Sequence, residues 1–223
     1  MKEDLEVFCD ASLRTFVDTQ RVFTCSGTIC RNTGEEKYII SQDSTNNRGE
    51  LFAIYIGIKL AEKSYLSNPD RYDKINLYSD SQFGIFGLTK WMPSWINNQD
   101  GSGTLYGSNR KPVKNQELFM MIITYLTTHN LKIHFYHQKG HVNTNQSKAL
   151  AQANKVFKES NGFWLSPENI FKISFYNDIV DKNSRKILST VNQFDYPIIR
   201  YYDSNTIDMC SYVIPNNYRE FVK

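Results

Sequence analysis

The stretch from residue 43 to residue 62 constrains the fold more than any other part of the sequence, because a polar run turns there directly into a hydrophobic helix. Residues 43–49 are mostly Asp, Ser, Thr, Asn and Arg, and Glu50 stands at the junction. From Leu51 the apolar residues recur at helical spacing over most of the circumference, which is typical of a central, buried helix. A carboxylate on the inward side of such a helix is costly unless a cation meets it. The pattern therefore predicts a cationic partner for Glu50.

Length and composition are those of a globular protein with a substantial core. The chain has 223 residues, of which 40% are hydrophobic and 14% aromatic, and its formal net charge is +3. This balance permits a nucleic-acid partner, but it requires any basic footprint to be local. We expect one catalytic domain over residues 1–190 and a C-terminal extension, residues 191–223, packed on or beside it.

The four cysteines have neither CxxC pairs nor the spacing of a zinc site, so we interpret them as reduced thiols. The charged start has no apolar signal core, and no run approaches the length of a membrane span. We expect a cytoplasmic monomer with no membrane partner and no small-molecule cofactor. Abundant Asn, Lys, Ile and Tyr suggest an AT-rich source such as a virus or phage, for which the location would be the host cytoplasm.

Secondary-structure signals predict an α/β fold with a five-stranded mixed sheet flanked by helices. Three β-prone runs joined by short links predict antiparallel strands at residues 5–9, 21–30 and 37–40. The central helix then crosses over to a fourth strand, which must run parallel to a neighbour. The fourth and fifth strands are expected at residues 74–79 and 131–137. Further helices are expected at residues 83–91, 115–129, 146–159 and 177–188.

Acidic residues stand at the predicted strand ends and helix starts. Asp10 follows the first strand, Glu50 opens the central helix and Asp80 follows the fourth strand. Asp178 and Asp181 fall in the first turn of the last predicted helix. The carboxyl ends of adjacent parallel strands meet where ligands of open α/β sheets usually lie. Four carboxylates there would suit Mg²⁺, and two such ions could hold a phosphodiester and generate the attacking hydroxide.

Several short motifs, in this order, resemble type I ribonuclease H over most of residues 5–190. They are Asp10-Ala-Ser, Thr45-Asn-Asn-Arg-Gly-Glu50, Tyr78-Ser-Asp80-Ser-Gln82, Lys111-Pro-Val-Lys-Asn115, Lys139-Gly-His141 and Asn177-Asp-Ile-Val-Asp181. One such motif arises by chance in many chains, but an ordered set in suitable strand and helix contexts is a strong signal. The resemblance implies a ribonuclease H-like fold and hydrolysis of the RNA strand of an RNA/DNA hybrid with two Mg²⁺ or Mn²⁺ ions. The products would carry 5′-phosphate and 3′-hydroxyl ends.

The resemblance also implies roles for individual residues. The metal ligands would be Asp10, Glu50, Asp80 and Asp181. His141 would assist proton transfer or product release near the leaving group. The Asn-acid-x-x-Asp pattern favours Asp181 as the fourth ligand, whereas Asp178 competes for that role or simply complements a helix N-terminus. As alternatives, Asp10 and Asp80 could be turn residues that close strands, and His141 a surface histidine.

Substrate contacts are expected first from the polar run before the central helix. Amides and side chains at a helix start can hold a phosphate or a minor-groove edge. The resemblance suggests that Asn47 and Gln82 touch the hybrid while Thr45 and Arg48 approach the DNA phosphate, with Asn46 in the same run. A protein that reads 2′-hydroxyls on one strand and a DNA-like sugar on the other distinguishes a hybrid by shape.

A second substrate contact is expected around the Gly/Ser loop at residues 97–109. It is flanked by Trp91, Trp95, Lys111 and Lys114, at the position of the basic protrusion that some family members use to grip a duplex. The loop itself has no Lys or Arg, so the two tryptophans could instead be packing residues.

The main departure from the family pattern is an insertion at about residues 143–176, between His141 and Asp181. One alternative function is a DNA nuclease of the same superfamily, against which Asn47, Gln82 and His141 argue. Another is a non-catalytic hybrid-binding module, which the full set of acids disfavours. A flavodoxin-like binder is a remote third, because no Gly-rich phosphate loop is present.

Overall fold

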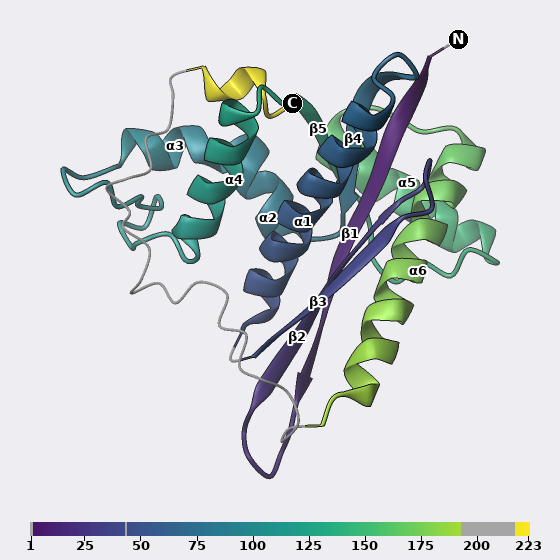
Figure 1. The fold of residues 1–223 in the computed structure, drawn as a ribbon, viewed down its shortest axis with the longest axis horizontal. Coiled ribbons are helices and arrows are strands. Elements are labelled where there is room, and N and C mark those ends of the chain that lie inside the picture. Colours follow the sequence, from purple (N-terminus) through teal and green to yellow (C-terminus); the bar gives the residue numbers. More distant parts are fainter. Residues whose placement is uncertain (1, 43, 193–216) are drawn as a thin grey trace.

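The computed structural model describes residues 2–42, 44–192 and 217–223, and its centre is a five-stranded sheet in the order β3-β2-β1-β4-β5 (Figure 1). β1 (Glu3–Thr15), β2 (Val22–Cys30) and β3 (Glu36–Gln42) pair antiparallel. β4 (Tyr72–Ser79) pairs parallel with β1, and β5 (Ile133–His137) pairs parallel with β4. The expected mixed sheet is confirmed.

β1 continues through Asp10, which corrects the expectation that this strand ends before it. Its antiparallel pairing with β2 runs on to Thr15, opposite Val22, whereas its parallel pairing with β4 ends where Cys9 lies opposite Ser79. One edge of β1 therefore stays paired while the other becomes open. Asp10 is the first residue of β1 that pairs with β2 but no longer with β4, so its side chain lies next to the end of β4.

Helices cover both faces of the sheet. α1 (Asn46–Ser67) lies on one face, and α5 (Ser147–Asn161) and α6 (Pro167–Thr190) lie on the other (Figure 1). On the α1 side lie α2 (Gln82–Phe86), a π-helical turn (Gly87–Trp91), α3 (Met92–Asn97) and α4 (Gln116–Thr128) (Figure 1). Alternate residues of β1 point to opposite faces. Leu5, Val7 and Cys9 join the core that includes α1, and Phe8 joins the core that includes α5 and α6.

Two helices begin earlier than expected. α1 starts at Asn46, because Thr45 is the N-cap and its hydroxyl accepts a hydrogen bond from the amide of Arg48 at 3.3 Å. Glu50 therefore follows the first turn instead of opening the helix. α6 starts at Pro167, capped by Ser166, whose hydroxyl accepts from the amide of Asn169 at 3.2 Å.

The early start of α6 changes the position of its acids. Asp178 and Asp181 lie in the middle of α6, and not in a first turn as expected. The proposed insertion, residues 143–176, contains α5 and the first part of α6. Asp181 consequently approaches the sheet from a long helix that packs across β1 and β2.

Most of the expected C-terminal extension, residues 193–216, lies outside the described residues. The final residues pack against β5, with Phe221 and Val222 buried. The amide of Ile133 donates to the carbonyl of Phe221 at 3.0 Å, and the amide of Phe135 donates to that of Lys223 at 2.8 Å.

Three cysteines, Cys9, Cys25 and Cys30, are buried free thiols, and Cys210 lies outside the described residues. Within the described ranges, no helix combines the length and the apolar character that a membrane span needs.

Candidate active site

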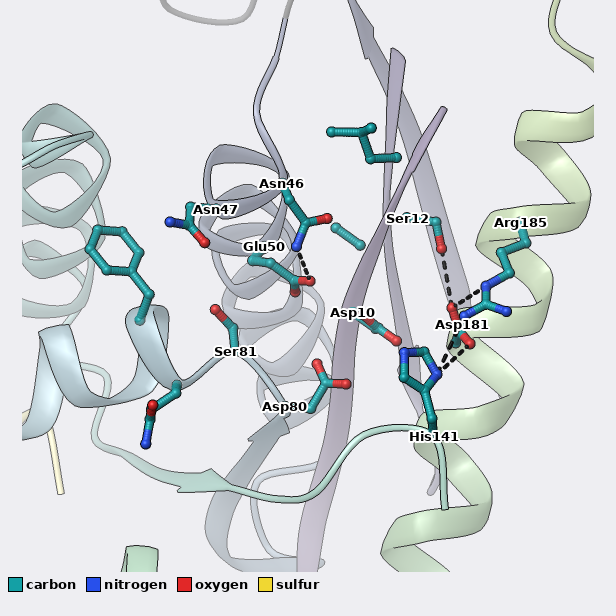
Figure 2. Close-up of a pocket in the computed structure, with 14 residues that line it drawn as sticks. Asp10, Ser12, Asn46, Asn47, Glu50, Asp80, Ser81, His141, Asp181 and Arg185 are labelled. Carbon is teal, nitrogen blue, oxygen red and sulfur yellow. Dashed lines mark hydrogen bonds and ion pairs between the residues drawn. The ribbon is translucent and has the colours of Figure 1, made fainter. Parts of the chain in front are cut away.

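A cavity of about 670 Å³ lies where the middle of β1, the end of β4, the start of α1 and the face of α6 meet. Its walls include Asp10, Ser12, Asn46, Asn47, Glu50, Asp80, Gln82, Phe83, His141, Asp181 and Arg185. Figure 2 shows Asp10, Glu50 and Asp80 pointing toward one another from three different elements, with Asp181, His141 and Arg185 on the α6 side. The structure thus brings all four expected metal ligands and the expected histidine to one cavity.

Asp10, Glu50 and Asp80 form a compact carboxylate cluster. One oxygen from each lies within 4.8 Å of the others. Asp10 Oδ2 and Glu50 Oε2 are buried and have no hydrogen-bond partner among the described residues. None of the ion pairs found between described residues involves these three acids. Buried acceptors without donors are costly, so these three carboxylates could hold a cation that the described residues do not supply.

The electrostatics of the cluster agree with this reading. Burial raises the pKa of Asp10 well above its ordinary value, and the charges of Asp80 and Asp181 raise it further. Burial also raises the pKa of Glu50, with Asp10 and Asp80 adding to the effect. The donor set contains only carboxylate oxygens, which suit a hard cation such as Mg²⁺ better than zinc or copper.

Asp80 is held in place by α6 and by the loop after β5. The side-chain amide of Asn177 lies 3.5 Å from Asp80 Oδ2, and Asn177 Oδ1 accepts a hydrogen bond from Gln138 Nε2 at 2.7 Å. Burial raises the pKa of Asp80, and the hydrogen bond from Asn177 opposes that rise. A Cβ at Gly140 would lie 2.0 Å from Asp80 Oδ2, so any side chain at this position would displace the Asp80 carboxylate.

Asp181 lies in the same cavity but is engaged differently. Its Oδ2 is 3.3 Å from His141 Nδ1, and its Oδ1 is 2.9 Å from Arg185 Nε and accepts from the hydroxyl of Ser12 at 3.2 Å. Asp178, the rival for the fourth ligand, instead forms an ion pair with Lys182 at 2.6 Å and does not line the cavity. The geometry favours Asp181.

The expected substrate contacts divide into two groups. Asn46, Asn47 and Gln82 line the cavity. Arg48 does not, because its guanidinium forms an ion pair with Glu117 and a 3.3 Å hydrogen bond with Asn115, which ties α1 to the start of α4. Thr45 is outside the cavity lining as well, where it caps α1.

The expected basic protrusion is only partly accessible. Trp95 is buried at 8% exposure, and its ring contacts Phe119 at a centroid distance of 5.1 Å. The expectation that Trp95 contacts nucleic acid is therefore corrected, because its ring fills the space between α3 and α4. Trp91 remains 38% exposed, and Lys111 and Lys114 are exposed outside the cavity.

Sequence reasoning gave no role to six residues of the cavity wall: Ala11, Ser12, Leu13, Ser81, Phe83 and Arg185. Arg185 had a usable signal, since it follows Asp181 by four residues, the spacing at which side chains meet on a helix. Ser12 and Phe83 had only the weaker signal of standing beside expected site residues.

Comparisons with known proteins identify the family. The family model for RNase H matches residues 2–157, well over half of the chain, and its match ends before α6 and Asp181. A ribonuclease H from Hydrogenovibrio crunogenus is 30% identical over 139 residues, covering 61% of this chain and 86% of that protein. One from Haemophilus influenzae is 29% identical over 162 residues, covering 72% and 93%. One from Orientia tsutsugamushi is 29% identical over 127 residues, covering 56% and 68%. The chain belongs to the RNase H family.

Proposed function

We propose that this protein is an endoribonuclease that hydrolyses the RNA strand of an RNA/DNA hybrid, leaving 5′-phosphate and 3′-hydroxyl ends. The observation that carries the proposal is the cluster of Asp10, Glu50 and Asp80, in which two buried carboxylate oxygens have no hydrogen-bond partner in the described part of the chain. The cluster stands in a chain of the RNase H family whose relatives bear the name ribonuclease H.

Asp10, Glu50 and Asp80 would hold one divalent cation, and Asp181 would join them in holding a second. Mg²⁺ fits this all-carboxylate set best, and Mn²⁺ accepts the same ligands. When bound, two such ions supply an activated water and stabilise charge on the leaving oxygen.

The protein's own side chains would position the substrate and move a proton. The amide groups of Asn46, Asn47 and Gln82 can both donate and accept hydrogen bonds, as recognition of 2′-hydroxyls and minor-groove base edges requires. His141 directs Nδ1 toward Asp181, so Nε2 is the ring atom that would exchange a proton with the 3′-oxygen of the product.

The proposal extends to the setting of the enzyme. Buried free thiols at Cys9, Cys25 and Cys30 are compatible with a reducing compartment, and we propose a cytoplasmic monomer.

The test is cleavage of a labelled RNA/DNA hybrid, compared with a DNA duplex and an RNA duplex, in Mg²⁺ and in EDTA. We expect cleavage of the RNA strand of the hybrid alone, only with the metal, and loss of cleavage in Asp80→Asn. Asp178→Asn is the matched control, because it removes the same charge from an acid outside the cavity.

Each alternative predicts a different result in this assay. Equal cleavage of the DNA duplex would identify a DNA nuclease of the same superfamily. Tight hybrid binding without cleavage in either metal would identify a non-catalytic binding module. Full activity of Asp80→Asn would contradict the proposed site.

A further inference from the structure

Asp181 differs from the other three acids of the cavity because protein groups already engage both of its oxygens. Ser12 and Arg185 contact Oδ1, and His141 contacts Oδ2. Asp10 and Glu50, by contrast, each keep a buried oxygen that has no hydrogen-bond partner within residues 2–42, 44–192 and 217–223. The fourth carboxylate therefore forms an ion pair with a protein cation, whereas among the described residues the cluster of three forms none, although the charge of Arg185 also acts on Asp10.

That cation is Arg185, which lies one turn after Asp181 on α6. Its Nε is 2.9 Å from Asp181 Oδ1, and its Nη2 is 3.3 Å from His141 Nδ1 (Figure 2). The side chain is 59% exposed, so it can leave Asp181 without opening the core. A guanidinium keeps its charge at every pH at which proteins are folded, so it competes with any other cation for this carboxylate.

We propose that Arg185 is an internal competitor of the second metal ion. It neutralises Asp181 while that ion is absent and must release Asp181 when the ion binds, so it raises the ion concentration that the second site requires. The inference rests on the proposed two-ion function and adds a residue that sets the affinity of one site.

The size of the effect follows from the exposure of the pair. An ion pair with an exposed partner contributes about 0.2–1 kcal/mol, which corresponds to about a 1.4- to fivefold change in an equilibrium constant. Such a competitor is weak enough for a divalent ion to displace it. It is strong enough to separate the affinities of the two sites.

The experiment is a calorimetric titration of Mn²⁺ into the full chain without substrate. We expect one ion to bind the cluster of Asp10, Glu50 and Asp80. The change from wild type to Arg185→Gln should alter its affinity less than that of the second ion, because Arg185 pairs with Asp181 and acts on Asp10 only as the last of several charges. The second ion should bind about 1.4- to fivefold more tightly in Arg185→Gln. Arg185→Lys, which keeps a cation at the same position, should restore weaker binding of the second ion.

Lys182→Gln is the matched control. Lys182 pairs with Asp178 at the same four-residue spacing on the same helix, and its removal changes the net charge by the same amount. It should leave both affinities unchanged. Thermal unfolding of each variant in EDTA checks that the fold is intact.

The outcomes separate this inference from the function on which it rests. Unchanged or weaker binding of the second ion in Arg185→Gln would overturn the role of Arg185 while leaving the metal site in place. So would weaker binding of a hybrid in EDTA with unchanged metal affinity, because Arg185 would then be a substrate contact. A wild type that binds no ion at all would contradict the proposed function itself, and the inference with it.

Discussion

Glu6 and Asp10 lie on the same strand, on the same face of the sheet, and both are buried, yet the protein treats them in opposite ways. Glu6 forms ion pairs with Arg31 and with Lys172, the second at 2.7 Å. Asp10 has acids for neighbours, and its Oδ2 has no hydrogen-bond partner among the residues that the structure describes. Between them Phe8 stacks on Tyr78 and Tyr176, each at a centroid distance of 5.0 Å, and separates the two regions.

The difference shows how a functional acid can be told from a structural one. At Glu6, one cation from the turn after β2 and one from α6 offset the cost of burying a carboxylate, and the pairs tie these segments to β1. At Asp10 no ion pair between described residues offsets this cost. Burial and the negative charges of Asp80 and Asp181 raise the pKa of Asp10 instead. The cost of burying a carboxylate is thus offset at Glu6 but not at Asp10. An external cation would offset it at Asp10.

The largest expected effect is on catalysis and comes from substitution of Asp10. Asp10→Asn should lower the rate of hybrid cleavage in Mg²⁺ by more than about 100-fold, since even groups that only support metal ligands contribute about 10- to 100-fold. Its thermal midpoint in EDTA should stay level or rise, because repulsion is removed. Rates come from single-turnover cleavage, and a loss below tenfold would show that Asp10 is not a ligand.

A second comparison concerns the two acids of α6. Asp181→Asn should reduce cleavage by about 10- to 100-fold, whereas Asp178→Asn should stay near wild type. The reason is that Asp181 lines the cavity and Asp178 is paired with Lys182 outside it. The same cleavage assay measures both, and an inactive Asp178 variant beside an active Asp181 variant would exchange their roles.

At Glu6, which is paired with Arg31 and Lys172, the expected effect is on stability. Glu6→Gln should lower the free energy of unfolding by about 1–3 kcal/mol, because two cations lose a buried partner. Arg31 and Lys172 keep 30% and 28% exposure, which holds the loss below that of a fully enclosed pair. Denaturant unfolding in EDTA measures it.

The rate of hybrid cleavage by Glu6→Gln should match wild type. The control for stability is Lys63→Gln, which breaks the exposed pair with Glu35 and should change it very little. A Glu6 variant that is fully stable but inactive would reverse the distinction between the two regions.

The smallest expected effect is a pH dependence of stability in the metal-free protein. Raised pKa values at Asp10 and Glu50, above ordinary values of 3.8 and 4.5, mean that the folded state holds protons that the unfolded chain releases. Their contribution to stability is therefore greatest below the unfolded-state values and is lost as the pH rises through the folded-state values.

In EDTA, wild type should lose stability relative to Asp10→Asn between about pH 4 and neutral pH, and Mg²⁺ at neutral pH should reverse the loss. Denaturant midpoints at several pH values provide the measurement. A difference between the two proteins that does not change with pH would argue against the electrostatic account.

Much of the site could be predicted from the sequence because its parts are local. Asp80 follows a short alternating strand and Glu50 lies near the start of a strongly apolar helix, so periodicity placed both. Asp10 was predicted to follow the end of the first strand, whereas β1 continues through it. The polar residues after it suggested a strand end, although Ala11 and Leu13 continue an alternation that pairing with β2 alone supports.

The remaining features depend on contacts distant in sequence. The ion pair of Arg48 with Glu117 of α4 was not predicted, because no local pattern links the two residues. The start of α6 had a local signal in Ser166-Pro167, an N-cap followed by proline at the first helical position, which the neighbouring aromatic residues obscured. How α6 then carries Asp181 to His141 follows from packing on the sheet.

The pairing of the final residues with β5 has a consequence for the protein's behaviour at high concentration. A β-strand with unpaired amides at the rim of a sheet is a template for strands of other molecules. The carbonyls of Phe221 and Lys223 accept the amides of Ile133 and Phe135, so that rim is already occupied. The final residues therefore block this edge of β5 from pairing with a strand of another molecule.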